Sequence, residues 1–326
     1  NFTSAADVYN VAVGYKAGTA VTTGVENTLI GALAGDAITD ADQNVAVGIA
    51  ALGANTVGGR STAIGTYALD AQNPASAMAM YNTAVGYDAG GAVTTGLNNT
   101  LVGSLAGDAL TTGTDNDAFG VSALSTDTKG NRSTAIGRGA LNAQNFTTST
   151  SVYNVAVGYL AGLSVTTGVS NTLIGALAGD ALTDADKNVA VGQRALSADT
   201  LGSKSTAIGT DALKVQNFTS ATDSYNTAVG FETGQSITTG LRNVLVGGLA
   251  GDSLTDADEN VAVGHAALTS DTLGSRSVAI GREALTTQNF TSATLAYNTA
   301  VGANAGQMLT TGINNTLIGG LAGDAI

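Results

Sequence analysis

The stretch Asn44-Val45-Ala46-Val47-Gly48 decides the fold, because close variants of it return eighteen times along the 326-residue chain. Examples occur at residues 10–14 (Asn-Val-Ala-Val-Gly), 61–65 (Ser-Thr-Ala-Ile-Gly) and 171–175 (Asn-Thr-Leu-Ile-Gly). Each copy begins with Asn or Ser, ends with Gly and carries a bulky apolar residue just before the glycine. Such a phased repeat predicts an array of similar units whose core grows by stacking.

The spacing of the motif glycines is regular. From Gly14 to Gly86 the intervals are 17, 17, 17 and 21 residues, and the same series continues to Gly319. Three short units and one long unit therefore form a super-repeat of 72 residues. The 21-residue unit carries a Gln-Asn-Phe-Thr segment at 144–147, 216–219 and 288–291.

The motif has the pattern of a short β-strand, since it is β-branched, alternates with period two and ends at Gly. A weaker second strand is predicted near residues 20–23. A helical repeat is excluded, because Gly recurs inside every unit and β-branched residues occupy the packing positions. We predict an all-β fold, a parallel β-solenoid of about 18 coils with a four-coil super-repeat. Residues 1–326 would form a single solenoid domain, a piece of a longer fibre protein.

Strand alternation separates two faces of the motif. Val45 and Val47 point to one side, and Asn44, Ala46 and Gly48 point to the other. The Asn side chains are expected to form a hydrogen-bonded ladder from coil to coil. A strand that is apolar on both faces is normally covered on both. We expect the small Ala/Gly face to meet a neighbouring chain, which predicts a homo-oligomer.

Composition and motifs exclude several classes of function. The net charge of −13 disfavours contact with nucleic acid, and no apolar run is long enough to insert into a membrane. Cysteine is absent, which excludes disulfides and Cys-based metal sites. His265 is the only histidine and occupies a variable position that we expect to be exposed. Without a nucleophile elbow, phosphate-binding loop or dinucleotide fingerprint, we predict no catalytic residue, no cofactor and no enzyme activity.

Pairs of aspartates in the second units are the candidate metal ligands. Calcium is bound by carboxylate oxygens, and the pairs are Asp40/Asp42, Asp184/Asp186 and Asp256/Asp258. The alternative is a solvated turn, which Thr112 and Thr114 favour because they replace both acids in one copy. Stacking also predicts surface ion pairs between Asp42 and Arg60, Asp186 and Lys204, and Asp258 and Arg276.

The 21-residue units are the candidate recognition loops. Three of them carry a Phe and a Tyr seven residues apart, at Phe146/Tyr153, Phe218/Tyr225 and Phe290/Tyr297, whereas the unit at 61–81 has Pro74 in place of the Phe. Loops on a rigid scaffold often carry recognition. The alternative, which we favour, is that these aromatic residues pin the loop onto its own coils or onto a neighbouring chain.

The motif resembles the head repeats of YadA-type trimeric autotransporter adhesins, as at 61–65 and 277–281 (Ser-Val-Ala-Ile-Gly). The 17-residue unit from Asn82 to Thr95-Gly96 is also similar to repeats of phage tail fibres. The resemblance implies a left-handed parallel β-roll, assembled as a trimer outside the cell, on a bacterial surface or on a virion. The implied role is a structural or adhesive fibre shaft whose partners are its own copies and a surface glycan or host receptor. The alternative is a tail-fibre or filament subunit whose 21-residue loops or Asp turns bind glycan or calcium. The adhesin heads use shorter coils than this chain.

Overall fold

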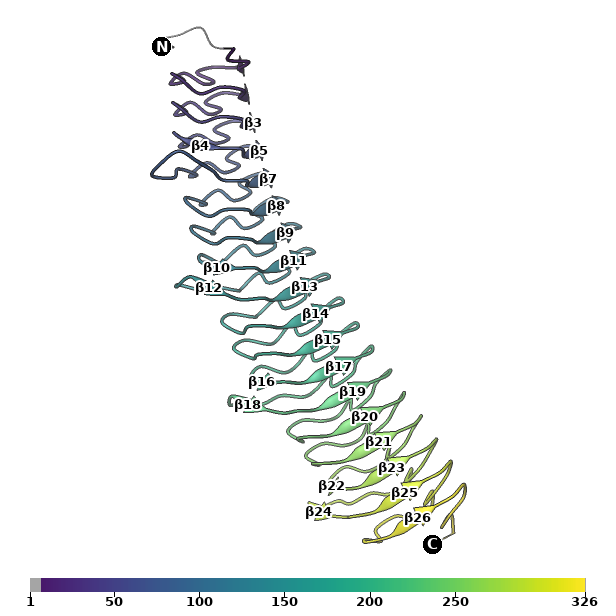
Figure 1. The fold of residues 1–326 in the computed structure, drawn as a ribbon. Coiled ribbons are helices and arrows are strands. Elements are labelled where there is room, and N and C mark those ends of the chain that lie inside the picture. Colours follow the sequence, from purple (N-terminus) through teal and green to yellow (C-terminus); the bar gives the residue numbers. More distant parts are fainter. Residues whose placement is uncertain (1–6, 326) are drawn as a thin grey trace. The chain divides into compact units, whose positions relative to one another are not determined.

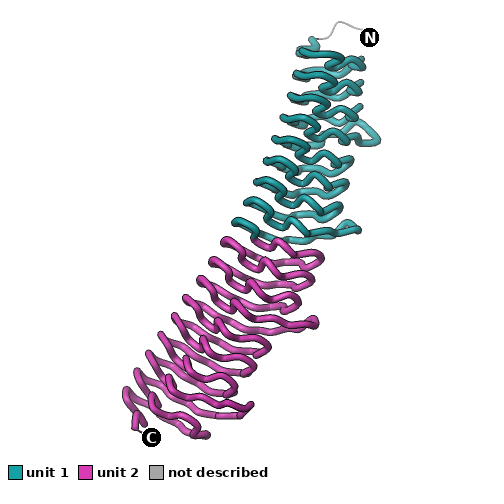
Figure 2. Tube along the Cα trace, turned by 180° about the vertical axis from the view of Figure 1, so that it is seen from behind, with its two compact units in different colours: residues 1–160 teal, residues 161–326 magenta. Residues whose placement is uncertain are grey.

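The computed structural model describes residues 7–325, and this part of the chain contains short β-strands, turns and no helix (Figure 1). Consequently, none of the described segments is a helix able to cross a membrane. The chain divides into two compact units, Asn1–Leu160 and Ala161–Ile326 (Figure 2). Both are built from the same parallel β-coils, about 18 in all. The predicted all-β parallel β-solenoid is therefore confirmed.

Every copy of the motif forms a three-residue strand. In the first unit these are β1 (Val11–Val13), β2 (Thr28–Ile30), β3 (Val45–Val47), β5 (Thr62–Ile64), β7 (Thr83–Val85), β8 (Thr100–Val102), β9 (Asp117–Phe119), β11 (Thr134–Ile136) and β13 (Val155–Val157). In the second unit they are β14 (Thr172–Ile174), β15 (Val189–Val191), β17 (Thr206–Ile208), β19 (Thr227–Val229), β20 (Val244–Val246), β21 (Val261–Val263), β23 (Val278–Ile280), β25 (Thr299–Val301) and β26 (Thr316–Ile318).

Within each unit, consecutive motif strands pair in parallel and in register. Val11 lies opposite Thr28, Ala12 opposite Leu29 and Val13 opposite Ile30, and the same register continues from coil to coil. Equivalent positions of the sequence repeat therefore stack directly on one another, about 4.8 Å apart. The constant spacing of the motif is the reason, because every coil returns the chain to the same place one strand further along.

The prediction of a second strand in every unit is wrong. Residues 20–23 form a turn and a bend, as do their counterparts in the other coils. The short second strands occur instead in pairs, one at the end of a 17-residue unit and one within the 21-residue unit that follows, and within residues 7–325 they form four two-stranded sheets. These are β4 (Gly58–Gly59) with β6 (Met78–Ala79), β10 (Gly130–Asn131) with β12 (Thr150–Ser151), β16 (Gly202–Ser203) with β18 (Thr222–Asp223), and β22 (Gly274–Ser275) with β24 (Thr294–Leu295).

The two faces of the motif strand are the reverse of the expected arrangement. Ala46 and Asn44 are fully buried inside the coil, whereas Val45 and Val47 point outward and are partly exposed. The same burial pattern recurs in almost every motif strand, with Leu29 buried and Ile30 39% exposed in the preceding coil. The small face therefore lines the core, and the β-branched face lies on the surface.

The narrow interior explains this orientation. The opposite wall of the coil carries glycines that lie against the inward leucine: a Cβ placed on Gly18 or Gly35 would lie 2.8 Å from a methyl carbon of Leu29. One inward leucine thus reaches across the coil to the far wall. Ala at the equivalent positions of neighbouring coils leaves room for buried residues of the turns, such as Leu52. Two β-branched side chains per coil would overfill this space.

The predicted Asn ladder is confirmed, and it lies inside the core. Asn44 donates from Nδ2 to the Gly58 carbonyl at 3.0 Å and accepts the N–H of Ser61 at 2.9 Å. Its own N–H donates to Oδ1 of Asn27 in the preceding coil at 3.0 Å. Each Asn thereby satisfies buried backbone groups of its own coil and of the next, which would otherwise be costly to bury.

The corners of the coils use left-handed backbone. Leu33 and Gln43 have φ values of 61° and 60°, which costs a non-Gly residue about 1–3 kcal/mol. Stacking offsets this cost, because the N–H of Leu33 donates to the Tyr15 carbonyl at 2.8 Å and that of Gln43 donates to the Val25 carbonyl at 3.0 Å. The corners are thus held by the preceding coil rather than by local preference.

Candidate functional site: the edge formed by the 21-residue units

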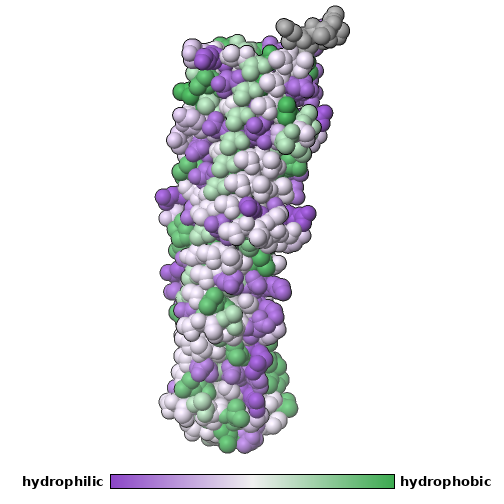
Figure 3. All heavy atoms as spheres, turned by 90° about the vertical axis from the view of Figure 1, so that its left-hand side faces the viewer, coloured by the Kyte–Doolittle hydropathy of each residue, from purple (hydrophilic) through white to green (hydrophobic). Residues whose placement is uncertain are grey.

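The 21-residue units interrupt the regular coils on the side that carries the short second sheets (Figure 1). On the face drawn in Figure 3, hydrophilic and hydrophobic residues are interspersed, with no single continuous apolar patch. This edge combines loops, charged residues and tyrosines. It is therefore a candidate site.

The phenylalanines of the predicted recognition loops are buried. Phe146, Phe218 and Phe290 are 7%, 6% and 6% exposed, so their rings pack against the chain's own coils. The interpretation of Phe as a loop anchor fits this packing. The tyrosines differ, since Tyr153, Tyr225 and Tyr297 are each about half exposed and lie on the surface. Contact of these tyrosines with a ligand stays a prediction.

A buried aspartate, which the sequence pattern did not predict, accepts a hydrogen bond from the backbone N–H of each of these phenylalanines. Oδ1 of Asp199 accepts the N–H of Phe218 at 3.2 Å and that of Gly202 at 3.0 Å, while Oδ2 accepts Nε2 of Gln216 at 2.6 Å. Burial raises the pKa of Asp199. Asp127 and Asp271 make the same contacts with their own Gln and Phe.

The first long unit departs from this arrangement in a correlated way. Asn55 stands where the other copies have the buried Asp, and Pro74 stands where they have Phe. Proline has no N–H to donate, so one hydrogen bond that a carboxylate would receive is missing. Asn55 instead bonds both backbone groups of Gly58, accepting its N–H at 3.0 Å and donating to its carbonyl at 2.7 Å. This paired change was the available sequence signal.

Each exposed tyrosine of this edge makes a cation–π contact with a basic side chain of the preceding coil. Arg132 lies 5.7 Å from the ring centre of Tyr153 and donates to its hydroxyl at 3.0 Å. The same pairing joins Arg60 to Tyr81, Lys204 to Tyr225 and Arg276 to Tyr297. Cation–π contacts at exposed sites contribute about 0.5–1 kcal/mol each.

The surface ion pairs that stacking predicted are not formed. Lys204 bonds Asp223 of the following loop, which raises the pKa of Lys204 and lowers that of Asp223. Arg276 bonds Glu259 at 2.9 Å, and this contact lowers the pKa of Glu259. Arg60 donates to Gln43 rather than to Asp42. The reason is that the paired aspartates are turned to the preceding coil.

The six aspartates proposed as calcium ligands make the same two contacts in each pair. Oδ1 of Asp42 accepts the N–H of Val25 at 2.8 Å, and Asp40 accepts the hydroxyl of Thr23. Asp186 and Asp184, and Asp258 and Asp256, bond the preceding coil in the same manner. Within residues 7–325, no group of three or more His, Cys, Asp or Glu side chains is arranged to hold a metal ion. These contacts match the turn interpretation.

A second set of carboxylates lies close together in the first unit. Burial, followed by the like charges of Asp88 and Asp36, raises the pKa of Asp70. Burial and the charge of Asp88 also raise the pKa of Asp108, whose Oδ1 is buried and has no hydrogen-bond partner among residues 7–325. His265 is exposed, as predicted from its variable position.

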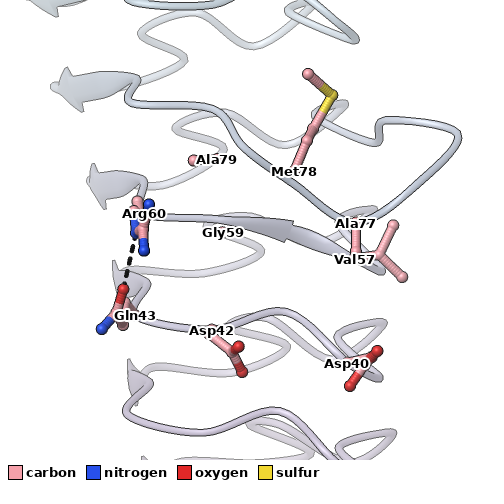
Figure 4. A pocket seen from close by; sticks show the side chains of 9 residues that line it. All are labelled: Asp40, Asp42, Gln43, Val57, Gly59, Arg60, Ala77, Met78 and Ala79. Carbon is pink, nitrogen blue, oxygen red and sulfur yellow. Dashed lines mark hydrogen bonds between the residues drawn. The ribbon is translucent and has the colours of Figure 1, made fainter.

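One pocket opens at the first long unit, with a volume of about 190 Å³ (Figure 4). Asp40, Asp42 and Gln43 line it from one coil, and Val57, Gly59 and Arg60 line it from the next. Residues 77–79 of the long unit close its apolar side. Polar and apolar walls therefore face a common space.

Comparison with known proteins adds no assignment: no protein-family model matches the chain, and no curated protein matches it.

Proposed function

We propose that this chain is a non-enzymatic fibre shaft that associates with its own copies through the outward face of the motif strands. The observation that carries this proposal is the scarcity of charge on that face. Among the outward residues of the eighteen described strands, Asp117 alone is charged, on a chain of net charge −13. Like-charged copies repel one another, so an uncharged face is where association costs least.

The size of the face supports self-association. Each coil offers two outward residues, almost all of them Val, Thr or Ile, and a patch of about 10 Å by 4.8 Å. The nine coils of each unit offer roughly 430 Å², about half of the roughly 800 Å² that each partner contributes to a standard protein interface, and each of the two units adds such an area. Parallel sheets are normally covered on both faces, and in each unit one face of the sheet has no cover among residues 7–325. The partner surface is thus the β-branched face, and not the small face favoured by strand alternation alone.

The remaining features of the proposal follow the resemblance to trimeric adhesin heads and phage fibres. The assembly would be a trimer, the 72-residue super-repeat of four coils would be its structural period, and its place would be extracellular, on a cell surface or a virion. The 21-residue units would project once per super-repeat. There they would present tyrosine and basic side chains to a surface glycan or host receptor.

A charge placed on the outward face tests the proposal. Val261 lies in β21 and points outward, so Val261→Asp should introduce repulsion between copies without disturbing the core. We expect sedimentation velocity and native mass measurement to detect an oligomer for the unaltered chain and a monomer for this variant. Ala293→Asp adds the same charge to an exposed loop and should leave the oligomer intact. A stable wild-type monomer at micromolar concentration, or an oligomer unaffected by Val261→Asp, would rule out this interface.

A further inference from the structure

The pocket of the first long unit exists where one side chain is missing. Gly59 lines the pocket, and the residues 72, 144 and 216 positions later are Asn131, Ser203 and Ser275. Those three side chains point at the preceding coil and accept a hydrogen bond from its backbone. Oδ1 of Asn131 accepts the N–H of Thr114 at 2.8 Å. The serine hydroxyls accept the N–H groups of Asp186 and Asp258, each at 2.9 Å.

The corresponding donor in the first unit is the N–H of Asp42, and it has no acceptor among the described residues. Gly59 stacks directly on Asp42, as a Cβ added to this glycine would lie 2.9 Å from the Asp42 carbonyl oxygen. The Asp42 carboxylate points away, toward Val25 of the preceding coil (Figure 4). The space beside this N–H is therefore where the other copies hold a side-chain oxygen.

Further polar groups border the same space. Arg60 donates to Gln43 and to the Tyr81 hydroxyl, which engages two of the five N–H donors of its guanidinium. Asp40 uses one oxygen for Thr23, leaving the other as an acceptor. Val57, Ala77 and Met78 supply apolar surface on the opposite side. An apolar wall facing a few convergent polar groups is the usual construction of a small-molecule site.

We propose that this pocket binds one sugar residue of a glycan, with a ligand hydroxyl taking the place of the serine hydroxyl found in the later copies. The ligand hydroxyl accepts the N–H of Asp42, and neighbouring hydroxyls bond Asp40 and Arg60. The apolar side of the ring lies against Val57 and Met78. This site is on the edge of the long units and does not depend on self-association through the strand faces.

The volume of the pocket and the charge of its lining restrict the class of ligand that it can bind. The volume of about 190 Å³ corresponds to roughly six water molecules, which suits a single ring rather than an oligosaccharide. Two carboxylates and one guanidinium give the lining a net negative charge, so a neutral sugar is favoured over an acidic one.

The sugar-binding proposal is tested by placing at position 59 the side chain that the later copies carry. Methyl glycosides of glucose, galactose and mannose are titrated against the full chain by saturation-transfer NMR and calorimetry. At least one is expected to bind with one site per chain, and Gly59→Ser should weaken that binding at least tenfold. The same serine is accommodated at positions 203 and 275, so the variant should fold, which circular dichroism checks.

The reverse change supplies an independent measurement. Ser275 lies between Asp258 and a loop with the same Asp, Arg and Ala residues as the first copy, at Asp256, Arg276 and Ala293. Thr294 stands where the first copy has Met78, so Ser275→Gly is combined with Thr294→Met, and this double variant should raise the stoichiometry from one glycoside to two. Binding of no glycoside, binding that survives Gly59→Ser, or a stoichiometry that stays at one in the double variant would each overturn the proposal. Calcium chloride is titrated in parallel, and binding of calcium alone would show that the pocket is a cation site instead.

Discussion

The buried Asn ladder gives the sharpest test of how the coils are held together. Asn260 lies in the second unit and is fully buried. Its Nδ2 donates to the Gly274 carbonyl at 2.9 Å, and its Oδ1 accepts the N–H of Ser277 in the next coil at 2.9 Å. Asn260→Ala removes both contacts and leaves a buried donor and a buried acceptor unsatisfied.

The cost follows from these two groups. Leaving a buried donor or acceptor unpaired costs about 1–3 kcal/mol, so the variant should lose roughly 2–6 kcal/mol of local stability. Asn260→Asp keeps an acceptor for Ser277 but turns a carboxylate oxygen toward the Gly274 carbonyl. The buried charge should raise the pKa of that aspartate in the folded chain. Its stability should therefore be greatest at low pH and be lost as the pH rises through the raised pKa.

Amide hydrogen exchange at Ser277 measures the effect locally, which matters because a repeat array need not unfold in one step. A loss of 2–6 kcal/mol corresponds to roughly 30- to 20,000-fold faster exchange, since each 1.4 kcal/mol is a factor of ten. Thr291→Ala, at an exposed loop position, is the control and should change little. Less than a threefold change at Ser277 in Asn260→Ala would refute the idea that the ladder stabilises the stack.

Three further predictions address the backbone, the loop anchor and the carboxylates. Gly247 has φ +129°, and a Cβ there would lie 2.5 Å from the Gly264 carbonyl oxygen. Gly247→Ala should therefore lower the free energy of unfolding by more than about 2 kcal/mol, as measured by thermal unfolding. The adjacent Gly248→Ala is the control and should be nearly neutral, because its Cβ would have no neighbour closer than 3.8 Å. Phe218→Ala should cost up to about 3–5 kcal/mol locally and expose residues 217–224 to limited proteolysis, whereas the half-exposed Tyr225→Ala should cost about 1 kcal/mol or less and leave the loop protected. Burial and the charge of Asp88 raise the pKa of Asp70, so the ionised Asp70 side chain destabilises the folded chain as the pH rises. Asp70→Asn should therefore raise the melting temperature at neutral pH, and this gain should disappear below pH 3.8, where the wild-type carboxyl group is protonated. An equal gain at both pH values would contradict the raised pKa of Asp70.

Much of the fold could be predicted because it depends on spacing. After each interval of 17 or 21 residues the chain forms the next strand at the equivalent position of the following coil. The parallel register of Ala12 with Leu29 therefore follows from the sequence period. The coil-to-coil bonds of Asn27 and Asn44 follow from the same stacking. The exposure of His265 was also predictable, since its position tolerates Ile and Gln in other units.

The candidate site was less predictable because it depends on contacts between different coils. Asp199 is an ordinary acidic residue in the sequence, and only the packing of Phe218 and Gln216 around it makes it a buried anchor. The pocket likewise depends on what Gly59 fails to provide to Asp42 of the preceding coil. Neither contact has a local signature, although the joint replacement by Asn55 and Pro74 marks the first copy as different.

The motif Asn44-Val45-Ala46-Val47-Gly48 by itself determined a strand, its repetition and the stacking of its copies. Period-two alternation divided its side chains between two faces. It did not decide which face lies inside, because both are largely apolar. Only the tertiary structure decided this: the far wall of each coil lies so near that Ala46 and Asn44 fit the interior and the β-branched Val45 and Val47 do not. The face that we propose for a partner is consequently the bulky one, on which Asp117 is the single charged residue of the described strands.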